Sequence, residues 1–139
     1  MKRFLTLSLV VLMLCTIIIP VSAANYDDQV MPCYNNVLTV NREFQISEDG
    51  VGTVTLNYIG YATTTGATIT SKVQKSTTSG WQDVTGAAWT DETSTIYATI
   101  NHTVDLTGTG TGTYRLVYEF EIRGSGAADE ISGTVEATY

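Results

Sequence analysis

Cysteine, histidine and basic residues are scarce in this chain of 139 residues. It has two cysteines, one histidine, and seven Lys and Arg against 14 Asp and Glu. Two cysteines exclude the multi-disulfide framework of many small secreted proteins, and the single His102 argues against a zinc site. Nucleic acids and anionic lipids are bound through clustered cations. We therefore expect no nucleic-acid partner, no metal and no cofactor.

The only long hydrophobic run lies at the start of the chain. Two basic residues at positions 2–3 precede an apolar run over 5–19, and small residues follow at Ala23 and Ala24. This order of segments is typical of a secretory signal peptide. We expect residues 1–24 to be a helical signal peptide that is cleaved near Ala23 or Ala24, so that the protein is secreted and extracellular.

Length separates this interpretation from a retained membrane anchor. The segment from Phe4 to Ile19 spans 16 residues, whereas a membrane-spanning helix needs about 20. We therefore expect the segment to be cleaved, after which the protein would not stay inserted in the membrane. Cleavage would also remove Cys15, so Cys33 would be the lone cysteine and no intramolecular disulfide could form.

Cleavage would make the chain more acidic. All 14 acidic residues lie beyond residue 24, and the loss of two of the seven basic residues leaves five, for a formal charge of −9. Scattered carboxylates on a secreted protein commonly serve solubility. The remaining chain of roughly 115 residues is long enough for one domain with its own core.

From Val37 onward, apolar and polar residues alternate with period two, and no helical period is present. Such alternation predicts strands that bury one face. The residues expected on buried faces are Leu38, Val40, Phe44 and Ile46, which share their face with Arg42; Val54, Leu56 and Tyr58; Ile69, Ser71 and Val73; Ile96, Ala98, Ile100, His102 and Val104; Tyr114, Leu116, Tyr118, Phe120 and Ile122; and Ile131, Val135 and Tyr139. Whether residues 81–89 form a strand of their own stays open.

The pattern predicts an all-β fold. We expect a two-sheet antiparallel sandwich of about six to eight strands, immunoglobulin-like or fibronectin-like, over residues 37–139, after an extended segment over 25–36. Trp81 follows the third strand and Tyr114 begins the penultimate one. They are candidates for the tryptophan between the sheets and the corner tyrosine of such sandwiches.

Several motifs resemble those of a group of small exported proteins of Gram-positive bacteria. The chain has a strand that ends in Gln74-Lys75, then Trp81, then Trp89, then the Gly-x-Tyr-Arg strand over 112–115. The resemblance is best over residues 67–139, and Val73 stands where Leu is usual before the Gln-Lys pair. It implies export and an immunoglobulin-like sandwich. The group is one of unknown function, so the resemblance carries over no catalytic or ligand-binding residues.

No catalytic constellation is visible in the sequence. His102 shares its strand face with apolar residues, which favours a neutral, hydrogen-bonded histidine over a general base or a metal ligand. The acidic pairs at 27–28, 48–49, 91–92 and 129–130 lack the spacing of a single-loop calcium site. We therefore expect that the protein is not an enzyme.

Aromatic residues are the best candidates for ligand binding. Trp81, Trp89, Tyr61 and Tyr97 lie at expected turns or at outward positions of strands. Exposed aromatic rings can stack on sugars or anchor a protein partner. Each tryptophan could equally fill the core between the sheets.

Three functions are compatible with the sequence. The first is a secreted, non-catalytic module that binds a protein or cell-surface partner. The second is a carbohydrate-binding domain, which predicts at least two coplanar exposed aromatic rings with Asn or Asp beside them. The third is a small hydrolase, which requires a cleft that brings His102 near an acid or a nucleophile. An exposed last strand over residues 131–139 could also support self-association through its edge.

Overall fold

The computed structural model describes residues 34–139, so the expected signal peptide and Cys33 lie outside the described residues. The described chain is all-β, with seven strands and one short 3-10 helix, η1. The strands are β1 (Val37–Ile46), β2 (Val51–Gly60), β3 (Gly66–Thr77), β4 (Gly80–Thr93), β5 (Tyr97–Asp105), β6 (Thr113–Arg123) and β7 (Asp129–Thr138), and η1 is Thr107–Thr109. The number of strands falls within the predicted range.

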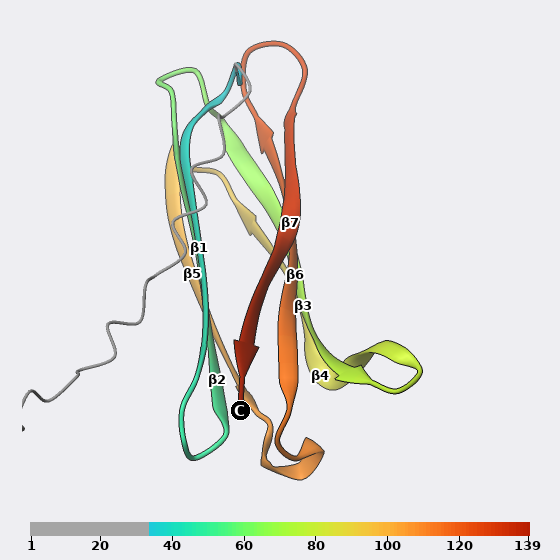
Figure 1. Cartoon of the computed structure of the whole chain (residues 1–139). Coiled ribbons are helices and arrows are strands. Elements are labelled where there is room, and N and C mark those ends of the chain that lie inside the picture. The colour runs from blue at the N-terminus through green and yellow to red at the C-terminus, as the bar shows by residue number, and fades with distance from the viewer. Residues whose placement is uncertain (1–33) are drawn as a thin grey trace, which may run out of the picture. The chain divides into compact units, whose positions relative to one another are not determined.

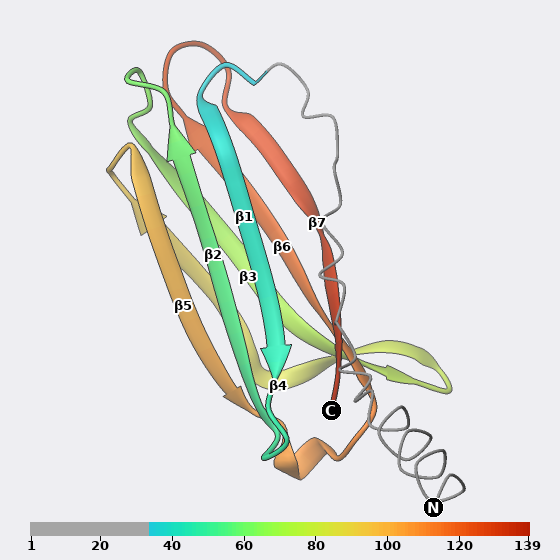
Figure 2. The ribbon, with the colours of Figure 1, turned by 60° about the vertical axis from the view of Figure 1, so that its left-hand side comes forward.

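The strands form two sheets that face each other (Figures 1 and 2). One sheet has three strands in the order β1-β2-β5, and the other has four in the order β4-β3-β6-β7. Every strand pair is antiparallel. The expected two-sheet antiparallel arrangement is therefore confirmed.

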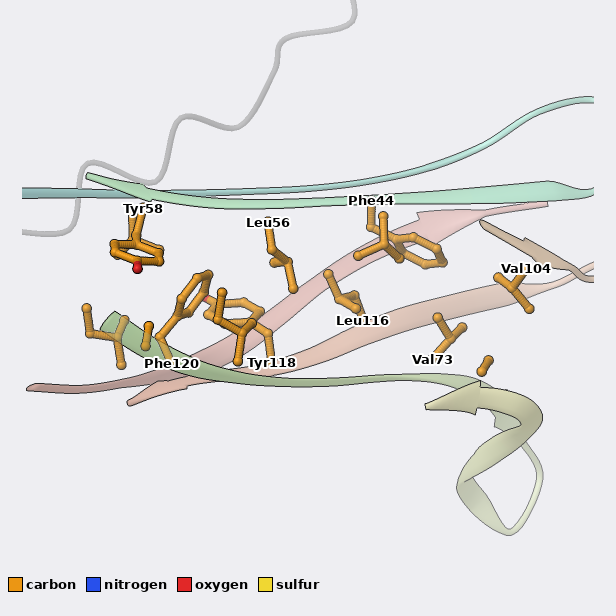
Figure 3. Close-up of a cluster of buried hydrophobic side chains, with 14 of the residues drawn as sticks. Phe44, Leu56, Tyr58, Val73, Val104, Leu116, Tyr118 and Phe120 are labelled. Carbon is orange, nitrogen blue, oxygen red and sulfur yellow. The ribbon is translucent and has the colours of Figure 1, made fainter. Parts of the chain in front are cut away.

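One hydrophobic core fills the space between the sheets (Figure 3). The central strands follow the predicted alternation: Val54, Leu56 and Tyr58 of β2 are fully buried. Every second residue of β6 from Tyr114 to Ile122 is also buried. These strands have a paired strand on each edge and the opposite sheet over one face. Since successive side chains of a strand point to opposite faces, every second side chain enters the core.

Two predicted core positions at the beginnings of strands are wrong. Leu38 is 56% exposed, and Val37 is buried in its place, because the pairing of β1 with β2 shifts register between Val37 and Thr39. A bulge of this kind moves the side chains that precede it to the other face. Ile96 is 45% exposed because it lies just before β5, outside the sheet.

The segment over 81–89 belongs to a long strand with an interruption. On β3, Gln74 pairs with Asp83 and Lys72 pairs with Ala88, so two steps along β3 correspond to five along β4. Gly86 adopts φ +77°, a conformation that favours glycine. Beyond this bulge, the tip of the β3–β4 hairpin extends away from the rest of the two sheets (Figures 1 and 2).

Tyr114 is tied to the chain that precedes it, as expected for a corner tyrosine. Its ring is fully buried. Its hydroxyl donates to the carbonyl oxygen of Gly110 and lies 2.6 Å from Thr109 Oγ1. The hydroxyl therefore holds the turn that contains η1 against the beginning of β6.

A buried carboxylate joins the beginning of β1 to the beginning of β7. Asp129 Oδ2 accepts hydrogen bonds from the backbone N–H groups of Asn36 (2.6 Å) and Val37 (3.1 Å), and Oδ1 accepts one from Asn35 (3.1 Å). The Asn36 side-chain amide donates to the carbonyl oxygens of Ile122 (3.3 Å) and Ala127 (2.8 Å). We call residues Asn35, Asn36, Val37 and Asp129 the Asp129 node; it links the two sheets at one end.

Substitution of Asp129 tests this node. Asp129→Ala leaves three backbone N–H groups without their acceptor, so we expect the free energy of unfolding to fall by about 3 kcal/mol. Glu130→Ala, at the exposed neighbouring position, is the control and should change it by less than about 0.5 kcal/mol. Urea denaturation measures both values. Equal, small effects of the two substitutions would contradict the role of the node.

Candidate functional site

Most of the exposed large apolar side chains gather at one end of the three-stranded sheet. We call them the end patch: Leu38, Ile59, Tyr61, Ile96 and Tyr97, each between 42% and 66% exposed. Ile59 is the cross-strand partner of Tyr97, and the Gly60 N–H donates to the Ile96 carbonyl oxygen at 2.6 Å. The beginning of β1, with Leu38, pairs with the same end of β2.

The local chain explains why these side chains are exposed. The bulge in β1 places Leu38 outside the core, and Tyr61 lies in the β2–β3 loop. Ile59 follows the buried Tyr58 in β2, so its side chain points to the outer face of the sheet, and its cross-strand partner Tyr97 points to the same face. The backbone of Tyr61 is held in place, because its N–H donates to the Asn36 carbonyl oxygen at 3.0 Å.

A shallow hollow of about 340 Å³ lies beside Tyr97 on the outer face. Side chains of Asn41, Asn57 and Thr99 line it together with Ile59 and Tyr97. Asn57 pairs with Asn41 on one side and with Thr99 on the other, so the polar groups form a row across the three strands. An exposed aromatic ring beside amides and a hydroxyl can contact either a protein or a sugar.

The outer face around the hollow has few charges. Its residues are Thr39, Asn41, Glu43 and Gln45 of β1, Val51, Thr53, Thr55, Asn57 and Ile59 of β2, and Tyr97, Thr99, Asn101, Thr103 and Asp105 of β5. Two of these are carboxylates, and none is basic. The face therefore offers apolar contact and neutral hydrogen-bonding groups, with no cation for an anionic ligand.

Two of the four aromatic residues singled out from the sequence, Tyr61 and Tyr97, belong to the end patch. Leu38 and Ile96 were expected in the core, so sequence reasoning missed them as surface residues. Ile59 carried a usable signal, because it is an isoleucine at an outward position of β2. Trp81 and Trp89 lie elsewhere, on β4.

Trp81 lies on the outer face of the four-stranded sheet, so it does not take the position between the sheets for which it was a candidate. It pairs with the exposed Ser76 of β3 and is itself partly exposed. The Arg115 guanidinium lies 4.3 Å from the centre of the Trp81 ring. This cation–π contact covers one face of the ring.

A polar chain holds Arg115 in this position. Arg115 Nε donates to Gln74 Oε1 at 2.8 Å, and Gln74 Nε2 donates to Asp83 Oδ1 at 2.6 Å. Lys72 Nζ lies 3.0 Å from the same Asp83 oxygen. The hydrogen bond from Gln74, and then the one from Lys72, lower the pKa of the Asp83 carboxyl. Asp83 therefore stays ionised and orients its partners across β3, β4 and β6.

Trp89 lies on the inner face of β4, which is one of the two positions that the sequence left open for it. Its ring stacks on the His102 ring of β5, with centroids 4.5 Å apart and an angle of 3° between the planes. His102 Nε2 lies 2.8 Å from Asp91 Oδ2. His102 is thus hydrogen-bonded on the inner side of its strand, as expected, and these three side chains connect the adjacent edges of the two sheets.

A second, larger hollow of about 540 Å³ crosses the outer face of the four-stranded sheet. Small or hydroxyl-bearing side chains line most of it: Thr70, Ala88, Thr90, Val117, Ser132 and Thr134. Trp89 and Tyr118 also line it, but both belong to the inward-facing positions of their strands, so neither ring is exposed as Tyr97 is.

The described part of the chain shows no metal centre and no membrane helix. Within residues 34–139, no three His, Cys, Asp or Glu side chains are grouped so that they could hold a metal ion. No helix in this range is long and apolar enough to cross a membrane. No protein-family model matches the chain, and no curated protein matches it either.

The two tryptophans should respond differently to truncation. Trp89→Ala removes a ring packed between the sheets, and we expect it to lower the free energy of unfolding by about 2 kcal/mol. Trp81→Ala removes a surface cation–π contact, and a loss below about 1 kcal/mol should leave the protein folded. Chemical denaturation of both variants measures this difference. A larger loss for Trp81→Ala would contradict the assigned positions.

Proposed function

We propose that the protein is a secreted, non-catalytic immunoglobulin-like module that binds a protein partner through the end patch. One observation carries the proposal. Five large apolar side chains, each at least 42% exposed, lie at one end of one sheet. Single exposed apolar residues are common, but a group of this kind is typical of an interaction site. Aromatic anchors such as Tyr97 and Tyr61 are frequent at the energetic centres of interfaces.

Secretion rests on the N-terminal sequence. The basic start, the 16-residue segment from Phe4 to Ile19 and the small residues at 23–24 support export with cleavage of the leader. A Thr-rich, acidic outer surface also suits a protein outside the cell, because scattered carboxylates favour solubility.

The strand order supports an immunoglobulin-like sandwich of the fibronectin type. In such sandwiches, the first, second and fifth strands form one sheet, and the fourth strand joins the sheet of the third, sixth and seventh. The orders β1-β2-β5 and β4-β3-β6-β7 match this arrangement. Tyr114, at the beginning of β6, matches the position of the corner tyrosine. Sandwiches of this kind host many functions, so the binding proposal depends on the end patch.

The surroundings of the single histidine support a non-catalytic role. His102 contacts the Asp91 carboxylate and the Trp89 ring. A hydrolase would need a nucleophile within hydrogen-bonding distance of the imidazole. Among the described residues, His102 has no serine, threonine or cysteine side chain as a hydrogen-bond partner.

Carbohydrate binding is the second candidate, and one observation favours it. Tyr97 lies beside the amides of Asn41 and Asn57 in the 340 Å³ hollow. An aromatic ring next to hydrogen-bonding amides is a suitable subsite for a sugar ring. Tyr58 also belongs to the lining, but its side chain is buried in the core, so Tyr97 is the one exposed aromatic ring at this hollow. The carbohydrate hypothesis requires two.

Two matched substitutions on β2 test the binding proposal. Ile59 and Val51 are both β-branched and exposed, at 48% and 42%, but Val51 lies at the opposite end of the strand. We expect Ile59→Ser to weaken saturable binding of the purified protein to the cells that produce it by about tenfold. Val51→Ser should leave the affinity unchanged.

Treatment of the cells separates the two candidate ligands. Binding that is lost after protease treatment of the cells supports a protein partner. Binding that resists protease but is lost after periodate oxidation of glycans supports the carbohydrate alternative. Equal affinities of the Ile59→Ser, Val51→Ser and unsubstituted proteins would contradict the end patch as the binding site.

A further inference from the structure

Each of the two sheets ends in two edge strands, and they differ in how well they are protected against pairing with another chain. β1 has a bulge and an inward-pointing Arg42 at its edge, and β4 has the bulge around Gly86 and an inward-pointing Asp91. β7 carries three carboxylates. Bulges and charges of this kind are the usual protection of edge strands.

β5 lacks these protections. It runs for nine residues from Tyr97 to Asp105 and pairs with β2 without a bulge. It contains no Pro, Gly, Lys or Arg, and its one carboxylate, Asp105, is the last residue. Figure 2 shows β5 along the outer edge of its sheet, with no further strand beside it.

The main-chain groups that face this open edge can be identified from the ladder with β2. The Gly60 N–H bonds to the Ile96 carbonyl oxygen, and the Leu106 N–H bonds to the Gly50 carbonyl oxygen. In an antiparallel ladder, alternate residues bond to the same neighbour. Even-numbered residues of β5 therefore face β2, and odd-numbered residues, from 97 to 105, direct their N–H and C=O groups outward. Of these groups, the Tyr97 carbonyl oxygen accepts a bond from the Thr95 hydroxyl.

We propose that β5 pairs with β5 of a second copy of this chain in an antiparallel, two-fold symmetric dimer. Residues that lie opposite each other in a sheet point to the same face, so a two-fold axis must place one residue opposite itself. Asn101 is the midpoint of β5. With Asn101 opposite Asn101 of the partner, all residues of β5 pair, and the outward-directed groups of both copies meet.

This register is chemically self-complementary. Thr99 falls opposite the partner's Thr103, and such threonine pairs stabilise sheets. On the inner face, Ala98 falls opposite the partner's Val104. Asp105 falls opposite the partner's Tyr97, and the two Asp105 carboxylates lie at opposite ends of the paired strands. No like charges oppose each other.

The same argument disfavours the last strand, β7, which the sequence suggested as the edge for self-association. Pairing of β7 with itself around Gly133 would place Glu130 opposite the partner's Glu136. Like charges directly opposite each other destabilise a sheet pair. The charge distribution therefore favours β5 over β7 as the dimer edge.

Single-cysteine variants test the register. The distance between opposite Cα atoms in a hydrogen-bonded pair, about 5.5 Å, lies within the range of a disulfide. In a chain whose two native cysteines are replaced by serine, Asn101→Cys should form a disulfide-linked dimer under mild oxidation. Thr99→Cys alone should not, because residues 99 of the two copies lie about 13 Å apart. A mixture of Thr99→Cys and Thr103→Cys proteins should give the mixed dimer.

Control variants distinguish pairing from random collision. Thr53→Cys lies on the same exposed face but on the central strand β2, and it should stay monomeric under the same oxidation. Crosslinking of Thr53→Cys as fast as Asn101→Cys would overturn the proposal. A mixed dimer between Ser132→Cys and Thr134→Cys of β7, which lie opposite each other in pairing around Gly133, would also overturn it if residue 101 gave no crosslink.

Sedimentation equilibrium tests the dimer without a crosslink. Asn101→Lys places two ammonium groups opposite each other, and we expect the dissociation constant to rise at least about threefold. Thr53→Lys adds the same charge away from the edge and should change it less. A monomeric mass at all concentrations up to millimolar overturns the proposal. Ile59→Ser is expected to weaken partner binding while it leaves the open edge of β5 unchanged, so loss of partner binding is distinguishable from loss of the dimer.

Discussion

The arrangement of the two sheets depends on the carboxylate of Asp129. The sheets have no backbone ladder in common, and between residues 34 and 139 there is no cysteine to link them. Asp129, at the first position of β7, accepts three backbone N–H groups from the chain that enters β1. The N–H groups of Asn36 and Val37 would otherwise be buried without a partner, which costs about 1–3 kcal/mol for each group. The node therefore fixes how β1 lies over β7.

The same node determines the shape of the end patch. The Asn36 carbonyl oxygen accepts hydrogen bonds from the Tyr61 N–H and from the Thr64 hydroxyl. The position of Asn36 is set by Asp129, so the β2–β3 loop that carries Tyr61 is positioned by a carboxylate of the other sheet. A surface for binding is more effective when its loops are ordered in advance, because less conformational entropy is lost on contact.

Period-two alternation correctly predicted the buried residues of the central strands, such as Leu56 and Leu116. Each central strand is paired on both edges and packs one face against the opposite sheet, so its side chains alternate regularly between core and surface. The prediction failed where strands are irregular. On β4, five steps match two on β3, so three extra residues lie between Trp81 and Trp89. An odd insertion exchanges the two faces, and the tryptophans, eight positions apart, therefore point to opposite sides of the sheet.

The role of Asp129 could not be predicted from the sequence, where it is one half of an acidic pair, because its donors lie more than 90 positions away. Tyr61 and Tyr97 were identified correctly as surface residues, since a loop and an outward strand position are local properties.

The size of the end patch connects the two proposals. Five side chains form a smaller contact than the roughly 800 Å² that each partner contributes to a standard stable interface. One patch alone therefore favours weak binding. In a dimer paired through β5, the outer faces of the two three-stranded sheets are continuous, and the two-fold axis at Asn101 places a Tyr97 at each end of the pair of strands. Two patches on one face can bind a surface that presents repeated copies of a partner, and the second contact then forms at a high effective concentration. In the proposed dimer, pairing through the unprotected β5 edge therefore brings two end patches onto one continuous face.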